Sequence, residues 1–192
     1  MAYPALLSIF EELGPPEVIK RSSQPLPVSV VKIVVGQMLS GAAAATIYRR
    51  LEKLYLEEGI EGPHLLKDKS LRSAGLSTAK TKAIRGFADA HAREPERFEA
   101  WKRCSYDELK KDATRLWGLS SWSASILALS HFGMTDVWPS EDGSIQRAVR
   151  IIRQSIEPEF QADKAAPYRT YLAKMLWAAL DNSLLTDQPR NR

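Results

Sequence analysis

Residues 116–142 read LWGLSSWSASILALSHFGMTDVWPSED, and the predicted architecture follows outward from them. They predict a tight turn around Gly118, followed by a short apolar helix. Pro139 then introduces an acidic pair, Glu141 and Asp142. A turn that opens a helix presents free backbone N–H groups, which suit a phosphate. The stretch therefore predicts a phosphate-binding hairpin with a carboxylate near it.

The composition is that of an ordinary globular protein with a small basic excess. The chain has 192 residues, enough for one domain or for two small lobes that share a cleft. Its formal net charge is +4, which favours a polyanionic partner only weakly. There is no signal-peptide pattern and no apolar run long enough for a bilayer. We therefore expect a cytoplasmic protein, and we also expect a monomer; association with the nucleoid, if the chain is bacterial, is implied only by the family resemblance given below.

The cysteines and histidines argue against a bound metal. Cys104 is the only cysteine, so the chain can form no internal disulfide, four-cysteine iron–sulfur cluster or zinc ribbon. The three histidines, His64, His91 and His131, lack the spacing of a metal site. We expect no metal site built from these residues.

Helical periodicity and helix-capping residues dominate the remaining sequence, which predicts an all-α fold. Residues 28–37, VSVVKIVVGQ, are rich in β-branched side chains that favour a strand, but they do not alternate and no partner strand is nearby. We expect a buried helix there. Further helices are predicted at 3–13 and 144–155, after the caps Ser40, Ser77 and Ser105, and from Pro167 onward.

Two motifs in residues 116–142 resemble those of the helix-hairpin-helix DNA glycosylases. LWGLSSWSA at 116–124 resembles the LPGIGPWTA hairpin of that family, and VWPSED at 137–142 resembles its VFPxxD, whose last aspartate is catalytic. Trp122 and Asp142 are 20 residues apart (142 − 122), which is similar to the spacing in bacterial 3-methyladenine DNA glycosylase II.

Three further stretches agree with this family in the same order. IVVGQMLS at 33–40 is similar to its IVGQQLS, and LRSAGLSTAK at 71–80 is similar to its LRxxGLSxxK. PYR at 167–169 and LW at 176–177 resemble its PWR and LW near the C-terminus. The resemblance therefore extends over residues 28–180 and rests on the order of five motifs.

The resemblance implies a base-excision enzyme that flips a damaged nucleotide of duplex DNA into a cleft between two helical lobes. Residues 1–192 would form one glycosylase domain, with the hairpin and catalytic region at 105–155 and the terminal helices completing the lobes. The implied reaction is hydrolysis of the N-glycosidic bond of alkylated purines, of the 3-methyladenine type. Asp142 would stabilise positive charge on the sugar; the alternative is that it only caps the following helix.

Aromatic and apolar residues complete the expected base pocket. Lyase members of the family carry a lysine at the position of Trp122, so the resemblance implies a monofunctional enzyme that leaves an abasic site. Trp122 and Tyr168 offer faces on which an alkylated base could stack, and Trp138 is assigned to the same pocket. Met38 is the candidate wedge for the vacated stack, with ordinary helix-end packing as the alternative.

The expected DNA contacts come from the hairpin and from three other segments. They are Gln37, Met38, Ser40, Lys80, Gly118, Leu119, Ser120, Ser121 and Arg147. Lys80 is equally compatible with a structural role, and Arg147 with a solvated face. Ser120 replaces the second hairpin glycine, where a left-handed conformation would cost ~1 kcal/mol; its N–H is expected to remain available to a phosphate. The resemblance also allows a monovalent cation at the hairpin carbonyls, and no other cofactor.

Trp117 replaces the proline of the family hairpin. Like Trp177, it is expected in the core or between the lobes. The two hairpin departures keep open a second class of protein, a DNA-binding relative without catalysis or with a different specificity. A third class is a helical interaction protein with no DNA role, whose affinity for a partner would not show the salt dependence of phosphate contacts.

Overall fold

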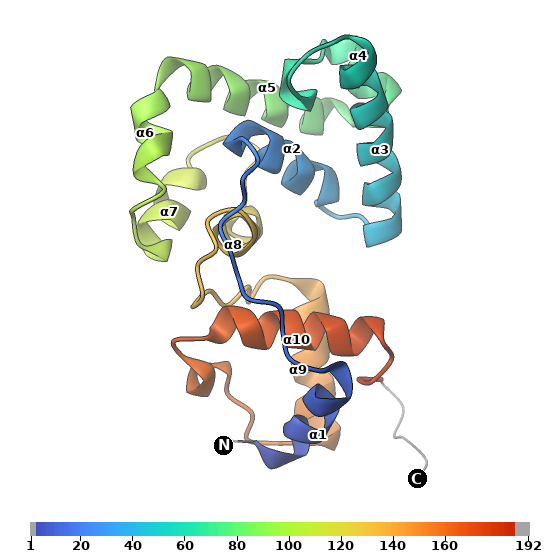
Figure 1. Ribbon diagram of the computed structural model, residues 1–192, viewed down its shortest axis with the longest axis vertical. Helices are drawn as coiled ribbons and strands as arrows, with labels where there is room; N and C mark the ends of the chain where they lie inside the picture. Colours follow the sequence, from blue (N-terminus) through green and yellow to red (C-terminus); the bar gives the residue numbers. More distant parts are fainter. Residues whose placement is uncertain (1–2, 187–192) are drawn as a thin grey trace. The chain divides into compact units, whose positions relative to one another are not determined.

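The computed structural model describes residues 3–186, and every regular element among them is helical (Figure 1). The predicted all-α class is confirmed. The chain divides into two compact units: unit 1 comprises Met1–Lys20 and Gly133–Arg192, and unit 2 comprises Arg21–Phe132. Within the described range, no helix is long and apolar enough to span a bilayer.

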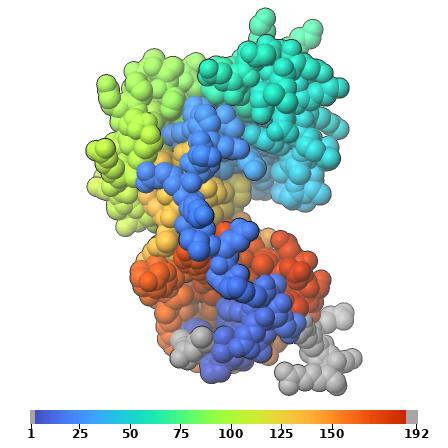
Figure 2. All heavy atoms as spheres, viewed as in Figure 1, coloured from blue at the N-terminus to red at the C-terminus, as the bar shows by residue number. Residues whose placement is uncertain are grey.

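Unit 2 carries the helices on both sides of the hairpin. They are α2 (Leu26–Gly36), α3 (Gly41–Glu57), α4 (Asp68–Ser73), α5 (Thr78–Arg93), α6 (Pro95–Ala100), α7 (Tyr106–Ala113) and α8 (Ser121–Ser130), with a 3-10 turn η1 (Pro63–Leu65). The segment that leads into α2, residues 21–25, is largely exposed and runs over the surface seen in Figure 2. The buried core of this unit therefore begins with α2.

The helix α2 forms the buried centre of unit 2. It contacts α3, α5 and α8, which lie around it in Figure 1. Four of its side chains are at most 1% exposed: Val30, Val31, Val34 and Val35. The predicted buried helix is confirmed. β-branched residues disfavour a helix by only about 0.5 kcal/mol each, and burying each side chain contributes about 1.5–3 kcal/mol, so packing outweighs strand propensity.

The sequence correctly predicted serine caps at the start of three of these helices, α3, α5 and α7. Ser40 Oγ and Ser77 Oγ each accept a hydrogen bond from the backbone N–H three residues on, at 3.3 and 3.2 Å. Ser105 and Glu108 form the expected capping box: Ser105 N donates to Glu108 Oε2 at 2.8 Å, and Glu108 N donates to Ser105 Oγ at 3.3 Å. Local sequence is sufficient to place these helix starts.

Unit 1 is built from three helices and a short turn. They are α1 (Pro4–Leu13), α9 (Gly143–Ser155), the 3-10 turn η2 (Ala162–Ala165) and α10 (Arg169–Asp181). The helix α10 contacts both α1 and α9. The core they share includes Ile145, Ile152, Phe160 and Leu176, none more than 1% exposed. This core holds the N-terminal end of α9, which begins directly after Asp142.

The prediction that the last helix begins at Pro167 is wrong, because α10 begins two residues later at Arg169. The Asp136 carboxylate binds the first residue of this helix. Its Oδ1 accepts a hydrogen bond from Arg169 N at 3.3 Å, and its two oxygens bind the Arg169 guanidinium at 2.7 and 2.9 Å. Asp136 lies 33 residues away in the sequence, so no local pattern could reveal this cap.

Candidate nucleic-acid interface and acid site

A tight turn joins α7 to α8 and forms the hairpin that the sequence predicted. Leu119 N donates to Leu116 O at 3.1 Å, and Gly118 has a φ of +86°. A side chain at Gly118 would overlap α5, because an added Cβ would lie 2.4 Å from Ala83 Cβ. The left-handed backbone and the close approach both require glycine at this position.

Ser120 is the N-cap of α8 and is not left-handed. Its φ and ψ are −94° and 174°, so the strain considered for this position does not arise. Ser120 and Ser123 form a capping box: Ser120 N donates to Ser123 Oγ and Ser123 N donates to Ser120 Oγ, both at 3.3 Å. The expectation that the Ser120 N–H stays available to a phosphate is therefore wrong. A serine in place of glycine begins the helix instead.

Two backbone donors of the hairpin do remain available. The N–H groups of Gly118 and Ser121 have no hydrogen-bond acceptor among residues 3–186. Ser121 is the first residue of α8, where the helix dipole places partial positive charge. An anion at this turn would satisfy both donors.

Gln37 connects the end of α2 to the hairpin through two hydrogen bonds. Its Nε2 donates to Gly118 O at 2.8 Å and to Ser123 Oγ at 2.9 Å. Gln37 was expected to contact DNA, and in the structure its amide nitrogen is bonded within the protein. Gln37 therefore positions the hairpin, which the motif alone did not indicate.

Lys80, on α5, binds the C-terminal end of α2, next to the contact between Gln37 and the hairpin. Its Nζ donates to Val35 O at 2.8 Å and to Gln37 O at 2.7 Å, and burial lowers the pKa of its ammonium. Both carbonyls lie at the C-terminal end of α2, where the helix dipole favours a cation. Of the two roles considered for Lys80, the structure supports the structural one.

Met38 follows Gln37 and is 100% exposed, with a φ of 56°. The alternative that Met38 packs against a helix end is therefore wrong. Its role as a wedge in DNA stays a prediction, and exposure is a condition that a wedge must meet. Ser40, two residues on, accepts the cap hydrogen bond of α3 through its Oγ.

An ion pair between α6 and α7 stabilises the position of α7, the helix that precedes the hairpin. Arg97 donates to both oxygens of Asp112, from Nε at 2.8 Å and from Nη2 at 2.9 Å, and Trp101 Nε1 donates to Asp112 Oδ2 at 2.9 Å. The hydrogen bonds from Arg97, with that from Trp101, lower the pKa of Asp112. Both side chains of the pair are about a quarter exposed, at 26% and 25%, so the pair is only partly screened by water.

We predict that Asp112→Asn lowers the free energy of unfolding by about 1–2 kcal/mol at pH 7. Because the folded-state pKa lies below the unfolded value, the carboxylate adds stability above a pH of about 4. That contribution is lost as the pH falls through the folded-state pKa. Urea unfolding at pH 7 and pH 3 measures this, and the difference between variant and wild type should shrink at pH 3. Asp107→Asn, on an exposed carboxylate of α7, is the control; an equal loss there would contradict the assignment.

In unit 1, Asp142 is the N-cap of α9. Its Oδ1 accepts hydrogen bonds from Ile145 N at 3.0 Å and from Trp177 Nε1 at 3.0 Å. The capping role considered for Asp142 is confirmed, and its catalytic role stays a proposal. Sequence reasoning missed Trp177, which was expected only as a packing aromatic. The LW motif near the C-terminus was the feature that could have indicated it.

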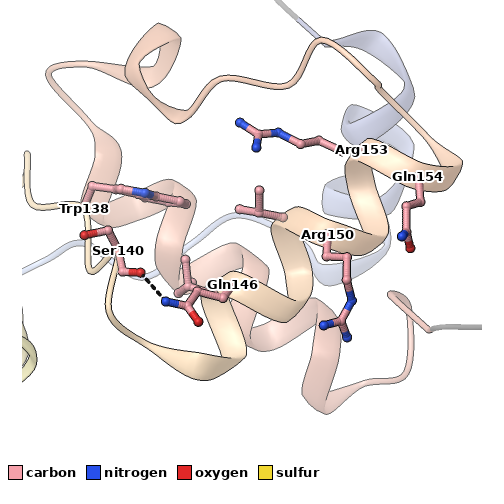
Figure 3. A pocket seen from close by; sticks show the side chains of 8 residues that line it. Trp138, Ser140, Gln146, Arg150, Arg153 and Gln154 are labelled. Carbon is pink, nitrogen blue, oxygen red and sulfur yellow. Dashed lines mark hydrogen bonds between the residues drawn. The ribbon is translucent and has the colours of Figure 1, made fainter.

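Trp138 lines a hollow of about 530 Å³ on the surface of α9 (Figure 3). The other residues that line it are Ser140, Ile145, Gln146, Val149, Arg150, Arg153 and Gln154. Asp142 is not among them. Trp138 and Asp142 therefore do not share this hollow, although both were expected at one base pocket.

The two remaining pocket candidates lie in different units. Trp122, in the first turn of α8, is half-buried beside Gly36, where an added Cβ would lie 3.9 Å from its ring. Tyr168, just before α10, is 60% exposed and makes an edge contact with Tyr171 at 6.2 Å between ring centres. Each has ring surface within its own unit that a base could cover.

The arginines of α9, Arg147, Arg150 and Arg153, are all exposed, but one of them is also bonded within the unit. Arg153 donates from Nε and Nη2 to Phe160 O at 3.1 and 3.0 Å, so it is structural. Arg147 is exposed, and its DNA contact stays a prediction. Across residues 3–186, no three side chains of the types His, Cys, Asp or Glu gather as metal ligands would.

Comparison with known proteins agrees with the motif order. The sequence matches no family model. It is 26% identical over 159 residues to DNA-3-methyladenine glycosylase 1 of Schizosaccharomyces pombe, an overlap of 77% of this chain and 69% of that protein.

Solved structures share the fold. A Schizosaccharomyces pombe 3-methyladenine DNA glycosylase, solved in complex with abasic DNA, matches with a TM-score of 0.78 and 22% identity over 97% of this chain and 94% of that chain. A DNA-3-methyladenine glycosidase from Bacillus halodurans matches with a TM-score of 0.71 and 24% identity over 94% and 86% of the two chains. A 3-methyladenine DNA glycosylase from Archaeoglobus fulgidus gives 0.69 and 16% over 95% and 67%.

Within the all-α fold, the helices α7 and α8 and the turn at Gly118 between them form a helix-hairpin-helix arrangement. By this fold, by the sequence similarity and by the order of its motifs, the chain is similar to the helix-hairpin-helix 3-methyladenine DNA glycosylases.

Proposed function

We propose that this protein is a DNA N-glycosylase that hydrolyses the N-glycosidic bond of alkylated purines, of the 3-methyladenine type, in duplex DNA. The observation that carries the proposal is the Asp142 carboxylate. One of its oxygens is held by two N–H donors at 3.0 Å each, from Ile145 and Trp177. The relatives with the same fold are 3-methyladenine DNA glycosylases.

A carboxylate held in this way suits the proposed chemistry. Cleavage of an N-glycosidic bond leaves positive charge on the sugar, and a fixed negative charge beside the sugar lowers the free energy of that state. The two donors orient the carboxylate before the substrate binds, so little reorganisation is needed during the reaction. An alkylated purine already carries positive charge and leaves as a neutral base, so the reaction needs no general acid to protonate the departing base.

The proposed enzyme hydrolyses the bond and stops there. A lyase needs an amine nucleophile that attacks the sugar, and Trp122 stands where the lyase branch carries its lysine. Water therefore supplies the oxygen that replaces the base, and the product is an abasic site. Trp122 and Tyr168, each within its own unit, offer aromatic surface that suits stacking with an electron-poor base.

Binding of the DNA backbone is assigned to the hairpin. The unpaired N–H groups of Gly118 and Ser121 would donate to one phosphate, in the way that helix N-termini bind anions. Met38, fully exposed beside this junction, would fill the space left by the flipped nucleotide. Arg147 would add charge near the acid. We expect affinity for duplex DNA to fall steeply with salt.

A panel of damaged duplexes tests the proposal. We expect the protein to release 3-methyladenine, measured by chromatography, from DNA treated with a methylating agent, and to release no base from untreated DNA. Oxidised and deaminated duplexes in the same panel define the specificity. Tight binding to DNA that contains an abasic-site analogue, without release of any base from the panel, would instead identify a DNA-binding relative without catalysis.

A further inference from the structure

We propose that Trp117 and Lys82 form a contact for the sugar–phosphate backbone of DNA, in addition to the hairpin N–H groups. The contact rests on the proposed function in one respect, namely that DNA reaches the hairpin. The proposed contact assigns a role to Trp117, which stands where the family hairpin has a proline. All of its residues lie in unit 2.

Trp117 was expected in the core or between the lobes, and in the turn between α7 and α8 it is 53% exposed. The ammonium of Lys82, an exposed residue of α5, lies 4.6 Å from the centre of the Trp117 ring. A lysine covers only part of an indole, and a cation–π pair in water is weak. Packing inside the unit therefore does not account for a large aromatic side chain at this position.

The backbone that carries Trp117 is held from two sides. The next residue, Gly118, lies against Ala83 of α5 so closely that an added Cβ would be 2.4 Å from Ala83 Cβ. From α2, Gln37 Nε2 donates to Gly118 O at 2.8 Å. A rigid attachment lowers the entropy that an exposed side chain loses on binding. An aromatic residue fixed in this way is suited to contact a partner.

Exposed apolar side chains flank the hydrogen bond that joins Gln37, at the end of α2, to Gly118 in the hairpin. Three well-exposed large apolar residues of unit 2 adjoin Gln37 or Gly118 in the sequence: Met38, Leu39 and Trp117. Met38 and Leu39 directly follow Gln37, and Trp117 directly precedes Gly118, so the Gln37–Gly118 hydrogen bond joins the two exposed segments. The surface is thus continuous with the proposed phosphate site, and Lys82 gives it positive charge.

The sugar–phosphate backbone of DNA matches this combination of groups. The deoxyribose ring offers apolar surface to an indole, and the adjacent phosphate offers negative charge to an ammonium. Each lysine that neutralises one phosphate makes the affinity more dependent on salt, with a change of about 0.9 in the slope of log K against log salt. The indole should contribute affinity with no effect on that slope, which separates the two side chains experimentally.

The test measures binding of undamaged duplex DNA by fluorescence anisotropy over a series of salt concentrations. We expect Trp117→Ala to bind about tenfold more weakly with an unchanged salt slope, and Trp117→Phe to recover most of the affinity. Lys82→Ala should bind more weakly at low salt and reduce the slope by about one. The matched controls are Leu56→Ala, at an apolar residue that is 66% exposed, and Lys53→Ala, at a lysine whose side chain is 76% exposed.

The contact is overturned if Trp117→Ala binds as wild type does, or if Lys82→Ala changes the slope no more than Lys53→Ala. Base release from alkylated DNA, with enzyme in excess and at saturation, is measured in parallel. Wild-type binding without any base release would remove the proposed glycosylase function and leave the contact in place. Base release by a protein whose Trp117 and Lys82 variants bind normally would remove only the contact.

Discussion

Replacing Asp142 with asparagine is expected to lower the rate of base release by about 10²–10⁴-fold, the range for a group that stabilises charge or moves a proton in the transition state. Asparagine keeps an oxygen that can accept from Ile145 N and Trp177 Nε1, the two donors that hold the aspartate. It is also as good a helix N-cap as aspartate. The change therefore removes the negative charge and leaves the local structure in place.

The capping and catalytic roles of Asp142 separate in a small set of variants. Asp142→Asn should unfold in urea within about 0.5 kcal/mol of wild type, whereas Asp142→Ala should lose about 1 kcal/mol with the cap. Glu141→Gln removes the neighbouring exposed carboxylate and should keep full activity. Single-turnover rates on methylated duplex DNA provide the comparison. If Asp142→Asn is as fast as wild type, the charge at this position is not used in catalysis.

Replacing Gly118 with alanine is expected to destabilise the protein by about 2–5 kcal/mol. The left-handed backbone, with a φ of +86°, costs a residue with a side chain about 1–2 kcal/mol. The added Cβ would also lie 2.4 Å from Ala83 Cβ, and overpacking of this kind costs about 1–3 kcal/mol. Relief of the overlap would move the hairpin away from α5, so binding of DNA should weaken in the folded fraction as well.

Two other variants isolate the causes of this loss. Gly86→Ala makes the same substitution in α5 at a glycine with no atom within 4 Å of an added Cβ, and it should stabilise the helix by about 0.5–1 kcal/mol. Combining Gly118→Ala with Ala83→Gly relieves the overlap but not the backbone strain. The double variant should therefore lose less than the sum of the single variants in urea unfolding. A Gly118→Ala protein as stable as wild type would contradict both causes.

Features that depend on neighbouring residues were determined by the sequence. Ser77 and Ser105 begin helices because a serine hydroxyl binds a backbone N–H three residues on. Gly118 marks the turn because glycine adopts positive φ without strain. The buried helix α2 followed from an apolar run with no strand partner. The hairpin and the acid at Asp142 were both evident from short motifs.

The tertiary structure alone decided which groups these motifs bring together. Asp136 caps α10 from 33 residues away, and Trp177 binds Asp142 from 35 residues away. Gln37 reaches the hairpin across 81 residues, so it positions the hairpin, and its contact with DNA stays a prediction. Periodicity and capping record only interactions within a few residues, whereas these hydrogen bonds form when packing closes long loops. The sequence by itself therefore determined the helices and the chemical groups, and only folding determined their partners.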